Sequence, residues 1–292
     1  MTKNIKSALV NIDIFDKEED VATMIRRIYV DLDNTLLPTE GNLPPKFFAY
    51  ADKFLGLVYE LRQSGVFVKL CTGRDHNSVE MATRALGLLE NNQFFVIEDG
   101  VARFNPTTKV QFLNPALTPE ILEAFERVHR EWTPRILLEF PELFEYKGNL
   151  VVVNFELKHG VTTPVEFFYK KIKKLLEPLV EQSLLEISNS GFSVDIKPVA
   201  NGVPINKAHG IRWDTTEERV SLPETLYIGD SMGDESAVRT TGYAACVGNA
   251  KGDFKAVIRE LGGHVSDYQY IEGVVDTIEQ LVFSRKPKLI AS

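Results

Sequence analysis

The sequence predicts an α/β fold with a parallel sheet, interrupted by a smaller α+β unit. Up to about residue 105, short apolar runs alternate with segments of helical periodicity. The same alternation returns from about residue 200, whereas the residues between have a different pattern. Alternating strands and helices are typical of parallel βαβ units. We therefore expect residues 1–105 and 200–292 to form one α/β core, and residues 106–199 to form an inserted α+β domain.

The first block contains alternating strand and helix signals. Apolar residues recur at three- and four-residue spacing in the helical segments, and Gly65 ends the first of them. An additional edge strand is expected at 8–15. The predicted elements are a strand at 27–33, a helix at 45–63, a strand at 66–71, a helix at 78–89 and a strand at 94–97.

The later segments extend this pattern. Thr118 followed by Pro119 is a good helix start, because threonine caps the first turn and proline suits its first position. The turn Asn189-Ser190-Gly191 predicts a hairpin. The inserted segment is expected to contain a helix from 119, a strand at 150–157, a helix at 165–176 and hairpin strands at 184–188 and 192–197. The core is expected to end with strands at 225–228 and 243–247, a helix reaching about 261 and a helix at 273–283.

Composition and charge exclude several classes of protein. The 292 residues carry a net charge of -8, which disfavours binding to nucleic acid or to an anionic membrane. Two cysteines are too few for a disulfide framework. The sequence has no apolar run long enough to span a bilayer and no signal-peptide core at its start. We expect a cytoplasmic protein whose partner is a small molecule; its oligomeric state is left open.

Polar clusters are expected at one edge of the sheet, where ligands bind in open parallel sheets. Three of them follow predicted strands directly. The clusters are Asp31-Leu32-Asp33-Asn34-Thr35, Thr72-Gly73-Arg74, Lys207, and Gly229-Asp230-Ser231-Met232-Gly233-Asp234.

These residue types suit phosphoryl transfer, which needs an in-line nucleophile and neutralised phosphoryl charge. Asp31 is the expected nucleophile. Asp33 lies two residues on, on the same side of an extended chain, and is the expected general acid and base. Asp31 and Asp230 would supply oxygen ligands for Mg²⁺. Thr72 would bond the phosphoryl oxygens, and Lys207 would balance the charge of nucleophile and phosphate.

As a set, these clusters resemble the four motifs of the haloacid dehalogenase-like (HAD) superfamily. The acidic run at 31–35 resembles its D-x-D-x-T motif, Thr72-Gly73-Arg74 its threonine motif, and 229–234 its G-D-x-x-x-D motif. Lys207 resembles the family lysine, although Ala208 follows where glycine is common. The resemblance covers about two-thirds of the chain. It implies a Rossmann-like parallel-sheet core with an inserted cap of the C2B type, as in Cof-like and sugar-phosphate phosphatases. The segment Gly248-Asn249-Ala250 resembles a further feature of that group.

The resemblance implies a Mg²⁺-dependent phosphatase acting on a small phosphorylated metabolite, with a sugar phosphate favoured. The implied catalytic residues are Asp31, Asp33, Thr72 and Lys207. The implied phosphate-binding residues are Gly73, Arg74 and Asn249. The implied metal ligands are Asp31, Asp33, Asp230 and Asp234, where Asp234 has the alternative role of orienting Lys207.

Two other functions stay open on the sequence. A phosphomutase would return the phosphoryl group to a second hydroxyl, and the core motifs do not separate it from a phosphatase. A catalytically silent binding protein would keep the fold, but it would be expected to have lost a nucleophile or a metal carboxylate, and all are present. No pattern selects the cap residues that contact substrate; Arg135, Lys147, Lys158 and His159 are candidates.

Overall fold

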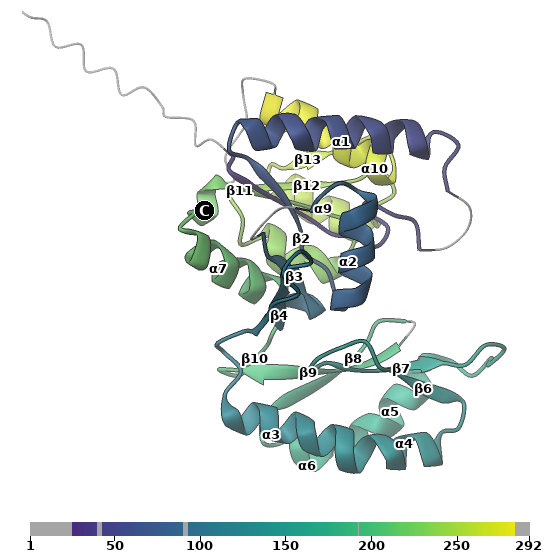
Figure 1. Cartoon of the computed structure of the whole chain (residues 1–292). Helices are drawn as coiled ribbons and strands as arrows, with labels where there is room; N and C mark the ends of the chain where they lie inside the picture. Colours follow the sequence, from purple (N-terminus) through teal and green to yellow (C-terminus); the bar gives the residue numbers. More distant parts are fainter. Residues whose placement is uncertain (1–24, 40–42, 90–92, 192, 284–292) are drawn as a thin grey trace, which may run out of the picture.

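The computed structural model describes residues 25–39, 43–89, 93–191 and 193–283 (Figure 1). The edge strand expected at 8–15 lies outside these residues. Figure 1 shows a larger α/β unit above a smaller α+β unit, whose sheet is turned towards the larger one and whose helices lie on its far side. Within the described ranges, no helix is both long enough and apolar enough to cross a membrane.

The larger unit contains a five-stranded sheet in the order β13-β12-β11-β1-β2, and every neighbouring pair is parallel. Its three central strands are almost completely buried, as expected of a parallel sheet covered on both faces. This confirms the predicted α/β class. The strands are β1 (Arg27–Val30), β2 (Phe67–Leu70), β11 (Thr225–Gly229), β12 (Tyr243–Cys246) and β13 (His264–Val265).

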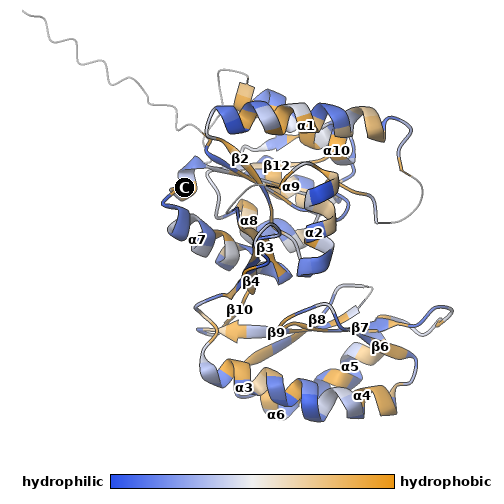
Figure 2. Ribbon diagram, viewed as in Figure 1, coloured by the Kyte–Doolittle hydropathy of each residue, from blue (hydrophilic) through white to orange (hydrophobic). Residues whose placement is uncertain are grey.

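Helices cover this sheet with their apolar sides. The helix α1 (Phe47–Gln63) packs beside α10 (Tyr270–Ile278), and α8 (Glu235–Val238) contacts both α7 and α9. Figure 2 shows that these helices carry both hydrophobic and hydrophilic residues, and that α7 is mostly hydrophilic. The remaining core helices are α2 (His76–Ala85), α7 (Lys207–Glu218) and α9 (Gly252–Glu260).

A three-stranded antiparallel sheet extends the core. It consists of β3 (Phe95–Ile97), β4 (Ala102–Phe104) and β5 (Gln111–Leu113). A parallel bridge between Cys71 and Val96 joins it to the main sheet. The sequence predicted β3, which is a continuous apolar run, but neither β4 nor β5, each of which contains a polar residue.

The inserted segment forms an antiparallel sheet backed by helices. Its strands β10, β9, β7 and β6 lie in that order, and β8 also pairs with β9. The β8–β9 pair confirms the predicted hairpin. Apolar residues of sheet and helices form a cluster separate from that of the core. The domain limits at 106 and 199 stay a prediction. The strands are β6 (Leu143–Tyr146), β7 (Val153–Leu157), β8 (Leu185–Asn189), β9 (Ser193–Ala200) and β10 (Val203–Pro204); the helices are α3 (Pro119–Arg127), α4 (Thr133–Glu139), α5 (Val165–Leu175) and α6 (Glu177–Val180).

One strand boundary differs from prediction for a specific reason. The strand expected from Leu150 begins at Val153 instead. The buried carboxylate of Glu98, in the core, accepts the backbone N–H groups of Leu150, Val151 and Val152 at 2.6, 3.1 and 3.3 Å. These donors are therefore unavailable to a sheet ladder. The contact ties the inserted segment to the end of β3.

Two helix boundaries also differ. The helix expected at 78–89 begins at His76, because the Asp75 side chain caps it, and it ends before Gly87, which has a left-handed φ of 64°. The helix expected at 273–283 begins at Tyr270 and changes to a π-helical turn at Glu279. The expected threonine cap of α3 is present, since Thr118 accepts the N–H of Ile121.

Candidate functional site

The four polar clusters meet at the carboxyl edge of the core sheet. Asp31 follows β1, Thr72 comes two residues after β2, and Asp230 follows β11. Lys207 is the first residue of α7, a helix the sequence analysis had not predicted. Because β1 lies between β2 and β11, all three strand ends lie side by side.

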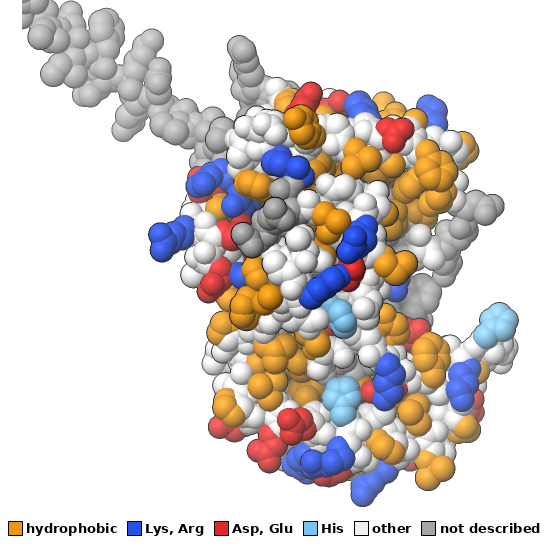
Figure 3. Space-filling model, in the orientation of Figure 1, with side chains coloured by type: hydrophobic (Ala, Val, Ile, Leu, Met, Phe, Trp, Pro, Cys, Tyr) orange, Lys and Arg blue, Asp and Glu red, His pale blue; other side chains and the backbone are white. Residues whose placement is uncertain are grey.

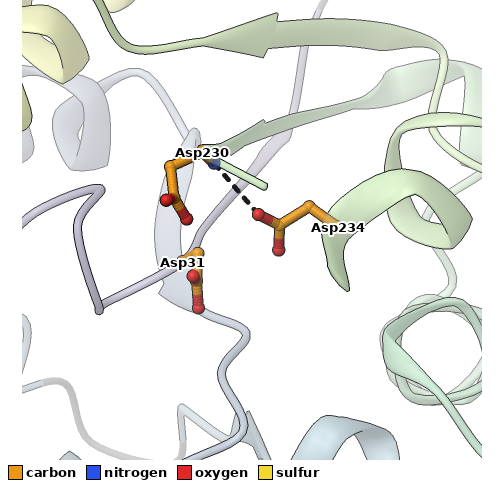
Figure 4. Close-up of side chains that lie close together, drawn as sticks. All are labelled: Asp31, Asp230 and Asp234. Atoms are coloured by element: carbon orange, nitrogen blue, oxygen red, sulfur yellow. Dashed lines mark hydrogen bonds between the residues drawn. The ribbon is translucent and has the colours of Figure 1, made fainter. Parts of the chain in front are cut away.

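Three carboxylates form the centre of the site. Oxygens of Asp31, Asp230 and Asp234 lie within 4.8 Å of one another, and all three residues are buried. Figure 4 shows Asp31 and Asp230 at neighbouring strand ends, with Asp234 reaching the Asp230 backbone from the segment that leads into α8. Such a group of charges needs compensation by a cation.

Lys207 supplies part of that compensation. Its Nζ atom lies 2.9 Å from Asp31 Oδ1 and 2.6 Å from Asp234 Oδ1, and its side chain is 7% exposed. Burial alone would lower the pKa of Lys207, but Asp234 and Asp31 outweigh burial and hold it well above its ordinary value. Burial raises the pKa of Asp31, an effect that Lys207 opposes. The lysine is therefore charged and held against the expected nucleophile.

The carboxylate of Asp234 is saturated by hydrogen bonds. Its Oδ1 accepts from Lys207 Nζ and from the Tyr227 hydroxyl, both at 2.6 Å. Its Oδ2 accepts the backbone N–H groups of Asp230 and Ser231 at 3.0 and 3.2 Å. These contacts favour the role of orienting Lys207 over that of binding a metal ion directly.

The carboxylate of Asp230, by contrast, has no hydrogen-bond donor within the described part of the chain, although the residue is only 7% exposed. Burial and the neighbouring Asp234 raise its pKa to about 6. A buried carboxylate that faces Asp31 without a donor is a group that a divalent cation would satisfy. The fit is best for an ion that prefers oxygen ligands.

The pKa of Asp230 predicts how pH affects the metal-free protein. Because the pKa is higher in the folded protein than in an unfolded chain, the folded state binds this proton more tightly, and the stabilisation is lost as pH rises through about 6. Lowering the pH from 7 to 5 should therefore raise the free energy of unfolding by about 1 kcal/mol more in wild type than in Asp230→Asn. Urea unfolding in EDTA at both pH values measures this difference. An identical pH response of the two proteins would contradict the assignment.

Asp33 and Arg74 are bound to each other. The Arg74 guanidinium donates through Nε and Nη2 to the two Asp33 oxygens, at 2.8 and 2.9 Å. Both side chains are partly exposed and line the same cavity as Asp31. The pair leaves Asp33 less available as a metal ligand than Asp31 or Asp230, while keeping it at the mouth of the site.

The other predicted phosphate-binding residues differ in position. Thr72 is fully buried and its Oγ1 accepts the N–H of Arg74 at 3.2 Å, whereas Gly73 lines the cavity. Asn249 does not belong to the described cavity wall. Its side chain donates to the carbonyl of Asn34 at 2.6 Å and accepts the N–H of Tyr270 at 2.8 Å, so it supports the loop after Asp33.

A cavity of about 630 Å³ lies between the core and the inserted unit. It is large enough for a small metabolite. The core contributes Asp31, Asp33, Asn34, Thr39, Gly73, Arg74, Glu98, Asp99, Asp230, Ser231 and Lys251. The inserted unit contributes Tyr146, Asn149, Val152, Asn154, Glu156, Ser190, Ser193, Asp195 and Lys197.

The cavity wall that the inserted unit contributes, here called the upper wall, was not predicted from the sequence. None of its four candidates, Arg135, Lys147, Lys158 and His159, is among the described residues that line the cavity. The signal it could have used is the alternation of polar and apolar residues within 153–157 and 193–197. On the face of the molecule drawn in Figure 3, basic and acidic side chains are interspersed.

Comparisons with known proteins agree with the fold. No family model matches the chain. The chain is 25% identical to a phosphoglycolate phosphatase of Methanothrix thermoacetophila, over 88% of this chain and 97% of that protein. It is 22% identical to the 5-amino-6-(5-phospho-D-ribitylamino)uracil phosphatase of Bacillus subtilis, over 91% of this chain and 98% of that protein. A match to a phosphoglycolate phosphatase of Methanobrevibacter smithii, 28% identical, spans about half of that relative's length, 48%.

Solved structures show the same fold. The sucrose-phosphatase of Synechocystis sp. PCC6803 superposes with a TM-score of 0.59 at 19% identity, covering 88% of this chain and 98% of that one. A haloacid dehalogenase-like hydrolase from Bacteroides thetaiotaomicron gives a TM-score of 0.59 at 16% identity, covering 88% and 99%. The chain therefore has the fold of the haloacid dehalogenase-like hydrolases, with its motif residues gathered at one sheet edge, and most of its length is similar to phosphatases.

Proposed function

We propose that this protein is a Mg²⁺-dependent phosphatase that hydrolyses a small polyhydroxylated phosphate ester, of the sugar-phosphate class, through an aspartyl-phosphate on Asp31. The observation that carries the proposal is the cavity itself. Its lower wall holds Asp31, Asp33 and Asp230, and its upper wall is a polar sheet face of amides, hydroxyls and carboxylates. The carboxylates of the lower wall suit the phosphoryl group and its metal ion, and the polar upper wall suits the alcohol that leaves.

The reaction would take place in two steps. An Asp31 oxygen attacks phosphorus and the P–O ester bond breaks, while Asp33 gives its proton to the leaving oxygen. Asp33 then takes a proton from water, the water oxygen attacks phosphorus, and the bond to Asp31 breaks to release phosphate. Mg²⁺, held by Asp31 and Asp230, would neutralise charge on the phosphoryl oxygens. Lys207, whose Nζ atom lies 2.9 Å from Asp31 Oδ1, would balance the negative charge during both steps.

Asp33 must exchange partners during this sequence. In the structure both of its oxygens accept from Arg74. A substrate phosphate in the cavity would offer Arg74 an alternative anion of higher charge, with matching bidentate geometry. Transfer of the guanidinium from Asp33 to phosphate would leave Asp33 free to hold the proton needed by the leaving group.

The polar upper wall arises from strand alternation. In β7, Val153 and Phe155 enter the apolar cluster of the inserted unit, so Asn154 and Glu156 face the opposite way. In β9, Ser193, Asp195 and Lys197 occupy that face as well; Asn154 pairs in register with Asp195, and Glu156 with Ser193.

This wall suits hydroxyl groups better than a second anion. Asp195 Oδ1 accepts from Asn154 Nδ2 at 2.6 Å and from Ser193 Oγ at 2.5 Å, which orients amide and hydroxyl groups beside the cavity. The described cation of the upper wall, Lys197, is bound to Asp99 at 2.6 Å. A carboxylate on the leaving group would face Glu156 and Asp195, which repel it. Polyol and sugar phosphates are therefore favoured over phosphoglycolate.

The test is phosphate release from a panel of sugar, polyol and carboxylated phosphate esters, with Mg²⁺ and with EDTA. We expect Mg²⁺-dependent turnover in which the best sugar or polyol phosphate exceeds phosphoglycolate in kcat/KM by at least about tenfold, the value of one well-placed hydrogen bond to a charged group. Asp195→Asn should reduce this ratio, whereas Glu186→Gln, on the neighbouring strand outside the cavity wall, should not. A preference for phosphoglycolate would contradict the proposed substrate class.

A further inference from the structure

A cluster of buried charged side chains lies beneath the active site, between the core sheet and α7. Lys69 and Asp214 are both fully buried and form an ion pair. Lys69 Nζ also lies 2.6 Å from Glu218 Oε1, and the Tyr29 hydroxyl donates to Asp214 Oδ2 at 2.7 Å. We call these four residues the α7 clamp.

The position of Lys69 is unexpected for its residue type. Its strand neighbours Val68 and Leu70 are buried apolar residues, as is usual for a parallel strand covered on both faces. A charged lysine at such a place loses its hydration, and an apolar side chain of similar volume would often be equally stable or more so. Stability alone therefore gives no reason for an ion pair here. Unlike apolar packing, an ion pair with hydrogen bonds fixes the relative orientation of the two elements that it joins.

Each member of the clamp lies on an element that carries an active-site residue or leads directly into one. Tyr29 precedes Asp31 by two residues on β1, and it is the register partner of Lys69 on β2. Lys69 precedes Thr72 by three residues. The clamp thus spans the two strands whose ends hold the nucleophile and the threonine.

The other two members of the clamp lie on α7. Asp214 and Glu218 lie on α7, whose first residue is Lys207. Seven residues, or about two turns, separate Lys207 from Asp214, so both point from the same side of the helix, roughly 10 Å apart along its axis. A rotation or an axial shift of α7 would break the clamp and would also move Lys207 away from Asp31.

We infer that the α7 clamp is a positioning device for catalysis: it sets the rotation and axial position of α7 against β1 and β2, so that Lys207 stays between Asp31 and Asp234. Apolar contacts alone would permit small slides of the helix, whereas the Lys69–Asp214 pair and the Tyr29 hydroxyl define one register. The inference rests on the proposed function, since it concerns the rate of that reaction. Lys69, Asp214 and Tyr29 are positioning residues, and none of them is among the described residues that line the cavity.

The experiment separates positioning from stability. The double variant Lys69→Met/Asp214→Leu replaces the ion pair by apolar side chains of similar size. The change also takes the carboxylate away from buried Arg103, whose Nη1 lies 3.5 Å from Asp214 Oδ1, and from the Tyr29 hydroxyl, so the melting temperature should fall. At a temperature where circular dichroism shows the variant folded, kcat for the best phosphate ester should fall about tenfold while KM changes less than threefold, because misplacement of a catalytic group affects the chemical step. A matched control, Glu166→Leu/Lys170→Met, removes an exposed ion pair on α5 in the inserted unit and should leave both constants unchanged.

A milder variant covers the case in which the double variant does not fold. Tyr29→Phe removes one hydroxyl and keeps the ring, and it should lower kcat two- to fivefold at unchanged KM. The inference is overturned if a folded double variant keeps kcat within twofold of wild type, or if Tyr29→Phe does so when the double variant is unfolded. Failure of the proposed function gives a different result, because wild type itself would then release no phosphate.

Discussion

Replacement of Asp31 by Asn is expected to lower phosphate release by at least about 10⁴-fold, because it removes the nucleophile and leaves only binding and charge stabilisation. The amide keeps the size of the side chain, and it removes one of the two buried carboxylates that Lys207 contacts. The variant should therefore stay folded. Initial rates with the best substrate, and mass spectrometry of acid-quenched enzyme to detect the phosphorylated aspartate, measure the effect.

Asp33→Asn provides the matched comparison. It should lower turnover of an alkyl phosphate by about 10²–10³-fold, since the leaving oxygen loses its proton donor. With p-nitrophenyl phosphate, whose leaving group needs no proton, it should still form the phosphoenzyme and then hydrolyse it slowly. Turnover that survives in Asp31→Asn, or a phosphoenzyme labelled at another residue, would show that the nucleophile has been assigned wrongly.

Lys207→Met should impair both activity and stability. Loss of the cation at the phosphoryl group is expected to lower kcat by about 10²–10³-fold. The change also leaves Asp31 and Asp234, which are 8% and 0% exposed in their side chains, without their shared cation. Breaking a buried pair in this way costs about 3–5 kcal/mol of unfolding free energy.

The predicted loss of unfolding free energy in Lys207→Met can be checked with a control variant and with added Mg²⁺. Lys174→Met, on the exposed side of α5, should change the free energy of unfolding by less than about 0.5 kcal/mol. Mg²⁺ should restore part of the stability of Lys207→Met, because a divalent cation can neutralise Asp31 in place of the lysine. Equal unfolding free energies of Lys207→Met and wild type in EDTA would argue against the charge balance described for this site.

Much of the fold could be predicted from local patterns. The strand–helix alternation of the core, the β8–β9 hairpin and the threonine cap of α3 depend on residues close in sequence, and each was confirmed. The short strands β4 and β5 escaped prediction because each contains a polar residue, so neither forms an apolar run like that of β3. The strand expected from Leu150 was shortened by Glu98, a residue more than fifty positions away, and no local pattern contains that contact.

By itself, the sequence determined which residues stand at the ends of the core strands, because apolar runs followed by carboxylates are local features and parallel strands bring their ends to one edge. Only the tertiary structure decided which role each of those residues has in the site. Asp234 is saturated by Lys207, Tyr227 and two backbone donors, while Asp230 is left without a donor among the described residues. The polar wall opposite them and the clamp under α7 likewise depend on contacts between distant segments. Hydrogen bonds and burial, which set these roles, exist only after the chain has folded.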